Sequence, residues 1–566
     1  MLDFSLRPLI TLPEDMLKGS RATDEMFGGN ILATRGEMTG LGCYDELVED
    51  LGVSGLRYPG GSLTEYNFDI TNPNAEEVTC SKTGETSDFI PLSEFMFYAS
   101  ENGHYVTIVI PTRDQLNQIR DENGNREPDI DEAELRIFIH DVATGVYGDA
   151  DIAGFEIGNE YWGSGDMNAV EYGQLSSQMA LIVDDELDIV AGDTGIDTED
   201  ISVLVQMGTN FGMSSLSREY AGWDSFDVID DLSNQHLEAN ISYENIGDSG
   251  AVNWTELNNE LVLMSFDTPE KIDAVGGVVG HIYTYGEDQP NSGNFVLDAI
   301  EHSWLNTEGF ENLDVYITEW NMKRPDVLDQ TKDYGLFEAH ELLDIMEDFM
   351  AAGVHRANVW PLLQNTANTL SKGEEYTELT APGEMFAMMS ENLPGKTAID
   401  FTPDGDRNTE YDAGPADVHA FAGDGDMVLY IASTSDATTI MDIDLSNLVS
   451  GFEDLEISVL GVALGEEPGN TSSKADIQPR DADIIFEDGI LEVDLDQGEI
   501  MQVVIRGIEP SDVFAPTFDA IEGNILTSIE IMEETKAVEG DVVDDDGSWG
   551  DMGMLLGLLP LLAFLS

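Results

Sequence analysis

The stretch IAGFEIGNEYW (152–162) begins as a largely apolar run and ends in polar and aromatic residues. Such a run is typical of a parallel strand buried on both faces, because helices cover both sides of a parallel sheet. Polar residues directly after the run belong at the carboxyl end of that strand. The stretch therefore predicts an α/β fold with functional side chains at the carboxyl edge of its sheet.

Seven further runs of this kind occur between residues 30 and 362, and amphipathic stretches such as DEAELRIFIHDVATGVYG separate them. This alternation predicts a (β/α)8 TIM barrel. The eight candidate strands are NILATR (30–35), SGLRYPG (54–60), YVTIVIP (105–111), IAGFEIG (152–158), ISVLVQM (201–207), VVGHIYTY (278–285), LDVYITEW (313–320) and RANVWPL (356–362). An open doubly wound sheet is the rival, but no G-x-G-x-x-G motif follows the first strand, which weakens its dinucleotide-binding form.

The pattern changes after about residue 396, where HAFAGDGDMVLYIASTS and DGILEVDLDQGEIMQVVIRG alternate apolar and polar residues between Gly- and Asp-rich turns. This period predicts an antiparallel β-sandwich. The domain assignment is an N-terminal segment (1–27), a catalytic barrel (28–395), the β-sandwich (396–509), an acidic linker or tail (510–551) and an apolar C-terminal segment (552–566).

The composition is strongly acidic, with 113 Asp and Glu against 23 Lys and Arg and a net charge of −90. Such a chain repels phosphate backbones and anionic lipid surfaces, so we expect no nucleic-acid partner. The acidity favours a marine, halophilic or extracellular protein, although an acidic cytoplasmic protein is the alternative. Two cysteines, Cys43 and Cys80, exclude a disulfide scaffold and any multi-cysteine zinc module.

The two ends of the chain carry ambiguous targeting signals. The first twenty residues lack a basic region followed by a long apolar one, so an ordinary signal peptide is not expected. The final MGMLLGLLPLLAFLS is shorter than the roughly 20 residues of a membrane-spanning helix. It is either an anchoring tail, which is the only membrane contact we expect, or a packed apolar end. We expect export to the cell surface or beyond by another route, with a cytoplasmic location as the alternative.

Two glutamates follow candidate strands on opposite sides of the predicted barrel. Strand four ends in Asn159-Glu160, and strand seven ends in Glu319-Trp320-Asn321. Active sites of such barrels lie at the carboxyl ends of the strands. Retaining glycosidases need two carboxyl groups about 5–5.5 Å apart, one as acid/base and one as nucleophile. The pair therefore predicts glycoside hydrolysis, whereas either glutamate alone is more typical of a salt bridge.

The segments LRYPGG (56–61), EIGNEYW (156–162), HIYTYG (281–286) and VYITEWN (315–321) resemble glycoside hydrolase clan A. They are most similar to the α-L-arabinofuranosidase family and its xylosidase and glucuronidase relatives. The resemblance covers the barrel, about residues 28–365. It implies a retaining mechanism that needs no cofactor, and a carbohydrate as substrate. It also implies that residues before about 28 can add a strand to the sandwich. The eight histidines do not cluster at ligand spacing, so no catalytic metal is expected, whereas calcium on an acidic loop stays open.

The resemblance also implies roles for individual residues. Glu160 matches the general acid/base, and Glu319 matches the nucleophile. The expected substrate-binding residues surround these two: Arg57, Asn159, His281, Tyr283, Trp320, Asn321, Trp360 and Gln364. Structural roles remain open for three of these: an ion pair for Arg57, a core histidine for His281 and core packing for Trp360.

The chain departs from the family at two substrate-recognition positions. Ser62 stands where an asparagine usually follows the Pro-Gly-Gly turn, and Asn30 is the nearest candidate for a first-strand glutamate. Long insertions over 61–90 and 208–275 are expected on the catalytic face, where Trp223 and Trp254 could form sugar subsites or pack between helices. These two differences do not change the predicted reaction type, but the identity of the sugar stays open.

Two other functions compete with hydrolysis. One is a non-catalytic surface protein that binds glycans on the same fold, and the other is an adhesive or structural surface protein. The oligomeric state is not readable from the sequence. If the protein is exported, Cys43 and Cys80 are expected to form a disulfide, because both follow neighbouring strands of the barrel.

We predict that salt stabilises the protein, because screening relieves the self-repulsion of a chain with a net charge of −90. The melting temperature, followed by circular dichroism from low salt to molar NaCl, is expected to rise. A melting temperature that stays flat or falls over this range would contradict salt adaptation.

Overall fold

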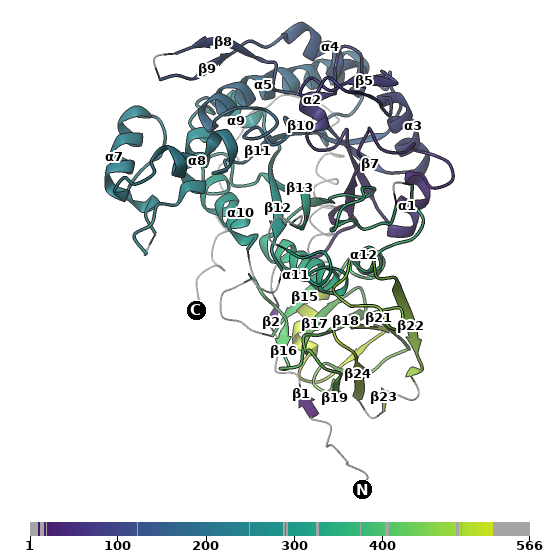
Figure 1. Ribbon diagram of the computed structural model, residues 1–566. Helices are drawn as coiled ribbons and strands as arrows, with labels where there is room; N and C mark the ends of the chain where they lie inside the picture. The colour runs from purple at the N-terminus through teal and green to yellow at the C-terminus, as the bar shows by residue number, and fades with distance from the viewer. Residues whose placement is uncertain are drawn as a thin grey trace, which may run out of the picture. The chain divides into compact units, whose positions relative to one another are not determined.

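Eight parallel strands close into a barrel in the computed structural model (Figure 1). The structure describes residues 9–11, 16–17 and 20–523, except 122, 248, 287, 288, 290, 291, 324–327, 374, 402–406, 483–485 and 488. In chain order the barrel strands are β3 (Gly28–Asn30), β4 (Gly55–Tyr58), β7 (Tyr105–Ile110), β10 (Asp151–Ile157), β11 (Ser202–Gln206), β12 (Gly277–Thr284), β13 (Asp314–Met322) and β14 (Arg356–Val359). The closed parallel barrel confirms the TIM-barrel prediction.

The first barrel strand lies earlier than the sequence pattern predicts. Strand β3 covers Gly28–Asn30, whereas the predicted run is 30–35. Neighbouring side chains fill the space at its two glycines. A Cβ on Gly28 would lie 2.4 Å from Asn358 Nδ2, and a Cβ on Gly29 would lie 2.6 Å from a Leu362 methyl group. Because close packing requires glycine here, this strand lacks the apolar run by which the other strands are recognised.

Helices alternate with the barrel strands, as the amphipathic stretches predict. The main ones are α1 (Tyr44–Leu51), α3 (Leu92–Asn102), α4 (Glu132–Ala143), α5 (Ala169–Thr194), α8 (Trp254–Leu263), α9 (Pro269–Asp273), α10 (Asn294–Ala299), α11 (Leu336–Ala352) and α12 (Ala381–Asn392). The longest, α5, begins at a capping box in which Asn168 and Glu171 satisfy each other's backbone N–H groups. It ends at Gly195, whose φ of +76° suits a residue without a Cβ.

The insertions fold into small elements of their own. Residues after β4 form α2 (Leu63–Tyr66) and the hairpin β5 (Glu77–Thr79) and β6 (Thr86–Asp88), and a second hairpin of β8 (Leu116–Arg120) and β9 (Arg126–Pro128) follows β7. Residues after β11 form α6 (Leu216–Glu219) and α7 (Ser225–Gln235) before α8. Tyr220 contacts Trp223 and Trp254 with ring centroids 5.2 and 6.5 Å away. The two insertion tryptophans therefore belong to one local aromatic cluster.

Two packed sheets follow the barrel and confirm the predicted β-sandwich. The larger sheet has the order β2-β15-β17-β18-β25-β21-β22, with β16 beside β17, and the smaller has the order β1-β19-β24-β23. The N-terminal strands β1 (Leu9–Thr11) and β2 (Met16–Leu17) pair with β19 and β15. The remaining strands are β15 (Thr397–Asp400), β16 (Tyr411–Asp412), β17 (Ala416–Gly423), β18 (Asp426–Ser433), β19 (Thr439–Asp444), β20 (Val449–Gly451), β21 (Asp454–Val462), β22 (Ala475–Arg480), β23 (Phe486–Glu487), β24 (Ile490–Leu495), β25 (Ile500–Arg506) and β26 (Glu509–Pro510).

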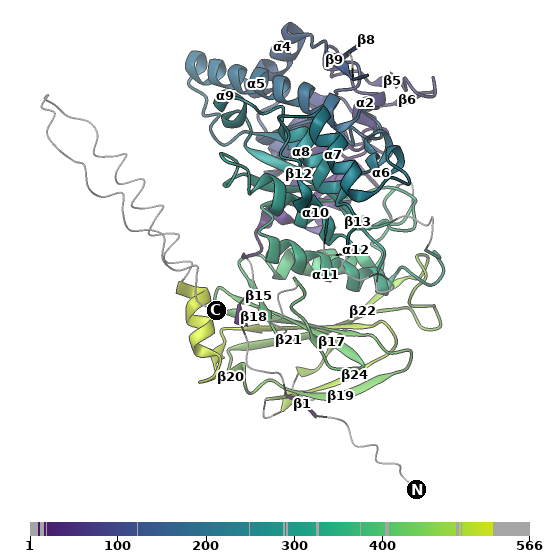
Figure 2. The ribbon, with the colours of Figure 1, turned by 90° about the vertical axis from the view of Figure 1, so that its left-hand side faces the viewer.

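The last two barrel helices contact the sandwich, as Figures 1 and 2 both show. Apolar side chains of α12 and of β18 and β25 share one buried core. The Tyr430 hydroxyl donates to the Met388 carbonyl at 3.1 Å and accepts from Gln502 at 3.1 Å, so the buried polar groups of this contact are satisfied. The barrel and the sandwich belong to one compact unit, 1–518.

The predictions about the C-terminal segments stay untested, and the prediction of a disulfide is wrong. The apolar segment 552–566 and most of the acidic tail lie outside the described residues. No helix within the described ranges is long and apolar enough to cross a membrane. The expected disulfide is not formed, because Cys43 and Cys80 are both free. Cys43 precedes α1, whereas Cys80 lies in the turn of the separate β5–β6 hairpin.

Glu260 on α8 gives a pH-dependent prediction. Burial, reinforced by repulsion from Glu256 one helical turn earlier, raises the pKa of Glu260 to about 7. Between its ordinary value and about 7 the folded chain holds a proton that the unfolded chain releases, so stability falls as the pH rises. Glu260→Gln is expected to stabilise the protein at pH 8 by about 1–3 kcal/mol and to change little at pH 4. Denaturant unfolding at both pH values checks this, and an equal effect at both would contradict it.

Candidate active site

A cavity of about 590 Å³ opens at the carboxyl ends of the barrel strands. Its wall combines carboxylates, an amide and several aromatic rings, the composition typical of a small-molecule site. The lining residues are Gly61, Ser62, Asn159, Glu160, Trp162, Phe211, His281, Tyr283, Tyr285, Ser292, Phe295, Glu319, Lys323 and Trp360. Both long insertions contribute to this wall, the first through Gly61 and Ser62 and the second through Phe211.

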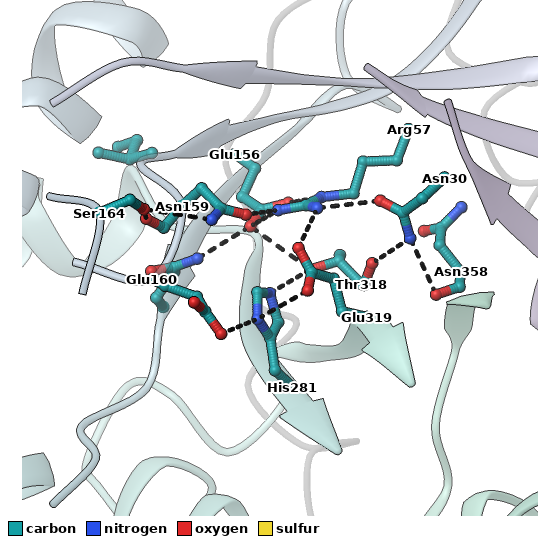
Figure 3. A network of polar contacts seen from close by, with 12 residues as sticks. Asn30, Arg57, Glu156, Asn159, Glu160, Ser164, His281, Thr318, Glu319 and Asn358 are labelled. Atoms are coloured by element: carbon teal, nitrogen blue, oxygen red, sulfur yellow. Dashed lines mark hydrogen bonds and ion pairs between the residues drawn. The ribbon is translucent and has the colours of Figure 1, made fainter. Parts of the chain in front are cut away.

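Glu319 lies at the base of this cavity, and its side chain is 5% exposed. Arg57 Nη1 donates to Glu319 Oε1 at 3.0 Å, and the Tyr283 hydroxyl donates to Glu319 Oε2 at 2.8 Å. Each carboxylate oxygen therefore accepts a hydrogen bond, one of them from a permanent cation. This arrangement fixes the orientation of the Glu319 carboxylate, and Figure 3 shows the contact with Arg57.

Arg57 is fully buried and makes five hydrogen bonds at the centre of the network (Figure 3). Its Nε and Nη2 atoms donate to the two oxygens of Glu156 at 2.7 and 2.8 Å. Burial alone lowers the pKa of Arg57, but the Glu156 and Glu319 carboxylates raise it above its ordinary value. Glu156 also accepts from Gln206 at 3.1 Å. Glu156 is not among the expected site residues, although a glutamate inside an apolar strand is a signal for a buried ion pair.

Hydrogen bonds hold both the side chain and the backbone of Asn159. Its Oδ1 accepts from Arg57 Nη2 at 2.9 Å, and its backbone N–H donates to Glu65 Oε1 at 2.9 Å. Glu65, on α2, also accepts from the backbone N–H groups of Thr112 and Arg113 at 2.9 and 2.8 Å. Burial raises the pKa of Glu65 despite these hydrogen bonds. The first insertion thus fixes the end of β10, a contribution that the sequence pattern did not indicate.

Glu160 follows β10 in a backbone conformation that glutamate seldom adopts. Its φ is +43°, in the left-handed region. Its carbonyl accepts from the Gly163 N–H at 2.7 Å, so a tight turn holds this conformation. Tyr161 anchors the same turn by stacking on Tyr172, with ring centroids 4.2 Å apart. Strain of this kind persists only where the surroundings enforce it, and here it places a 36% exposed carboxylate in the cavity wall.

His281 lies between the two glutamates (Figure 3). Its Nδ1 is 3.6 Å from Glu160 Oε1 and 3.7 Å from Glu319 Oε2, and its Nε2 is 3.2 Å from Thr318 Oγ1. Burial lowers the pKa of the imidazole, but the Glu319 and Glu160 carboxylates raise it by more, so the net pKa lies above its ordinary value. One oxygen of each glutamate and His281 Nδ1 lie within 4.8 Å of one another, so these three residues also offer donor atoms for a metal ion.

Trp360 and Gly61 form another part of the wall. A Cβ on Gly61 would lie 2.6 Å from Trp360 Cη2, so the indole packs directly over the glycine backbone. Asn321 Nδ2 donates to the carbonyls of Trp360 and Asn368 at 2.7 and 2.8 Å. Asn321 is fully buried and holds the Trp360 segment in place. Its expected contact with substrate is therefore corrected to a positioning role.

Three other sequence predictions need correction. Trp320 is fully buried against Phe349 and Phe386, because alternate residues of a strand point to opposite faces and Glu319 takes the cavity side. Gln364 lies beyond Trp360 and does not line the cavity. Asn30 does not reach the cavity either, since its amide bonds Arg57 and three carbonyls within the barrel.

Four aromatic side chains of the cavity wall are not among the site residues expected from the sequence. They are Trp162, Phe211, Tyr285 and Phe295. Trp162 meets His281 edge to face at 6.1 Å, and Phe211 meets Phe295 at 6.3 Å. Lys323 donates to the Tyr285 hydroxyl at 2.7 Å. Trp162 could have been predicted from the sequence, because it stands two residues after Glu160 in the same motif. Phe211 and Phe295 could not, because they lie in segments without a motif.

Comparisons with known proteins connect this fold to glycoside hydrolases. No family model matches the sequence, and no curated protein matches it. Among solved structures, the chain is similar to a GH51 arabinofuranosidase from Xanthomonas axonopodis pv. citri, with 13% identity, a TM-score of 0.50 and coverage of 86% of this chain and 98% of the other. It is also similar to a family 51 α-L-arabinofuranosidase from Bifidobacterium longum, with 14% identity, a TM-score of 0.55 and coverage of 88% and 98%. The expected resemblance to clan A glycoside hydrolases therefore has its counterpart in the fold, a TIM barrel followed by a β-sandwich.

Proposed function

We propose that the protein is a retaining glycoside hydrolase that cleaves glycosidic bonds of an oligosaccharide or polysaccharide. One observation carries the proposal. Oxygens of Glu160 and Glu319, from strands far apart in the sequence, lie within 4.8 Å of each other on one cavity wall. This short gap fits the ~5–5.5 Å separation of carboxyl groups in retaining enzymes better than the ~6.5–9.5 Å of inverting ones.

The environments of the two glutamates support a division of roles. Glu319 is buried, accepts from Arg57 and Tyr283, and is oriented as the nucleophile that attacks the anomeric carbon. Glu160 is more exposed and faces the cavity, where it protonates the leaving oxygen and then deprotonates the incoming water. His281 Nδ1 lies 3.6 Å from Glu160 and 3.7 Å from Glu319, so His281 is positioned to orient both carboxylates.

Arg57 has a positioning role in this proposal. It joins Glu319, Glu156, Asn159 and Asn30 in one buried network, so the nucleophile cannot rotate without breaking a charged hydrogen bond. Asn159 Nδ2 lies in the same cavity wall as Glu160 and can donate to a sugar hydroxyl, since its own contact with Ser164 is long at 3.4 Å. Trp360 and Trp162 offer ring faces and edges for the C–H surface of a sugar.

We further propose that the substrate is arabinofuranoside-like. The segments that resemble arabinofuranosidases and the similar fold of the two family 51 enzymes support this choice. Two recognition positions differ from the arabinofuranosidase pattern, Ser62 in the cavity wall and Asn30 within the barrel. We therefore expect a lower selectivity for arabinofuranosides over other sugars. A related five- or six-membered sugar is the first alternative to test.

A panel of aryl glycosides tests both proposals: arabinofuranoside, xyloside, glucuronide, glucoside and galactoside. We expect hydrolysis of one of them, highest for the arabinofuranoside, and loss of its steady-state turnover in Glu160→Gln, because the second step then lacks the base that deprotonates water. The exposed Glu308, on the surface away from the cavity, supplies the matched control, Glu308→Gln. Binding of a sugar without hydrolysis, unchanged by Glu160→Gln, would instead support a non-catalytic glycan-binding protein.

A further inference from the structure

Histidine and carboxylate side chains meet between α11 and β17, outside the cavity described above. His340 and Asp344 lie one turn apart on α11, and His419 comes from β17. His340 Nε2 is 3.0 Å from His419 Nε2, and Asp344 Oδ1 lies 3.7 and 3.9 Å from these two nitrogens. Thus three atoms of metal-binding types, from the barrel and from the sandwich, converge on one point.

The dimensions of this triangle fit a small divalent cation. Three atoms at these separations surround a point about 2.1 Å from each, within the ~2.0–2.2 Å of zinc bonds to histidine and carboxylate. Two imidazoles with one carboxylate also form a donor set that Zn²⁺ accepts, whereas Ca²⁺ and Mg²⁺ prefer oxygen atoms alone. The partial exposure of the Asp344 side chain leaves a path by which the ion and a water ligand can enter.

A second observation points to the same ion. Glu347 is 1% exposed, and its Oε1 lies 3.1 Å from His419 Nδ1. Within the described part of the chain, neither oxygen of Glu347 nor His419 Nδ1 has a hydrogen-bond partner, so the 3.1 Å contact is an ion-pair approach. A carboxylate behind a metal-bound histidine fixes the ring and directs the opposite nitrogen toward the metal. Here the opposite nitrogen is the one that faces His340.

The charge of the surroundings supports a cation. Glu341, Glu347, Glu410 and Asp417 all act electrostatically on Asp344. Negative charge at this density in a partly buried site is unfavourable unless a cation offsets it or the carboxyl groups take up protons. We propose that His340, Asp344 and His419 bind one Zn²⁺, which links the last helices of the barrel to the sandwich. The alternative is a protonated His419, whose Nδ1–H faces Glu347 and whose Nε2–H donates to His340.

Metal titration of the full chain, with any affinity tag removed, separates the two. After dialysis against EDTA, the protein is expected to bind one Zn²⁺ per chain in calorimetry and to melt at a higher temperature with zinc than without. X-ray absorption at the zinc edge is expected to report two imidazole ligands. Glu347→Gln is expected to weaken zinc binding by about 10–100-fold, as for carboxylates behind other metal ligands.

Substitutions decide which residues hold the ion. Asp344→Asn is expected to remove the binding event and the thermal shift, while His355→Gln, at an exposed histidine paired with Asp314, preserves both. His281→Gln is expected to leave the zinc event intact, because that histidine belongs to the catalytic cavity. If the Asp344 variant does not fold, the zinc stoichiometry and the X-ray absorption spectrum of the wild-type protein still test the proposed site. No stoichiometric zinc in the wild type, or loss of zinc only in His281→Gln, would overturn the proposal.

Discussion

Glu319→Ala is expected to lower kcat by about 10⁴-fold or more on whichever aryl glycoside the wild-type protein hydrolyses. The reason is that no other described carboxylate lies where it can attack the anomeric carbon from the same side. Glu156 is close in space, but its two oxygens are taken by the Nε and Nη2 atoms of Arg57. The loss should therefore be in the chemical step and not in substrate binding, so KM changes little.

Azide provides the internal control for this variant. A small anion can enter the space vacated by the Glu319 side chain and attack the substrate, giving a glycosyl azide of inverted anomeric configuration. Rescue by azide, with that product identified by NMR, shows that the variant is folded and lacks only the nucleophile. An inactive, correctly folded variant that azide never rescues would argue for a structural role of Glu319.

Glu160→Ala is expected to produce the second largest effect, and its size should depend on the leaving group. A general acid contributes about 10²–10⁴-fold where the departing oxygen needs a proton. Aryl glycosides with strongly acidic phenols need little protonation, so their first step should be nearly spared. Substrates with alkyl or sugar leaving groups should lose the full factor, which a series of substituted phenyl glycosides measures as a steeper dependence on phenol pKa.

The matched comparison for Glu160 is His281→Asn, which leaves the acid in place and removes only its imidazole neighbour, whose Nδ1 lies 3.6 Å from Glu160 Oε1. That variant is expected to alter the pH profile without the steep leaving-group dependence. Equal losses for all leaving groups in Glu160→Ala would contradict the assignment of Glu160 as the acid.

Most of the fold was predictable because its signals are local. A buried strand such as β7 is a nearly continuous apolar run, and the change of period near residue 396 marks the sandwich. The first strand was misplaced because Gly28 and Gly29 are dictated by side chains from residues more than 300 positions away. Tertiary packing of this kind leaves no periodic pattern in the sequence.

The candidate site was predictable where it follows strand ends and unpredictable where it depends on side-chain direction. Glu160, Glu319, Arg57 and Tyr283 come together in the structure, and each stands in a motif of the sequence. Trp320 is adjacent to Glu319 yet points into the core, a difference of one residue in register. The remaining wall comes from insertions, whose position on the barrel no local pattern specifies.

The most direct test of the central claim is to trap the covalent intermediate. The protein is incubated with the 2-deoxy-2-fluoro derivative of the hydrolysed aryl glycoside, digested, and its peptides are analysed by mass spectrometry. Fluorine slows both steps, and a good leaving group lets the first proceed, so the glycosyl–enzyme accumulates. A mass increase of one fluorosugar on Glu319 is the predicted result. A label on Glu160 or another residue, or an unlabelled enzyme that turns over substrate with inversion, would contradict the account.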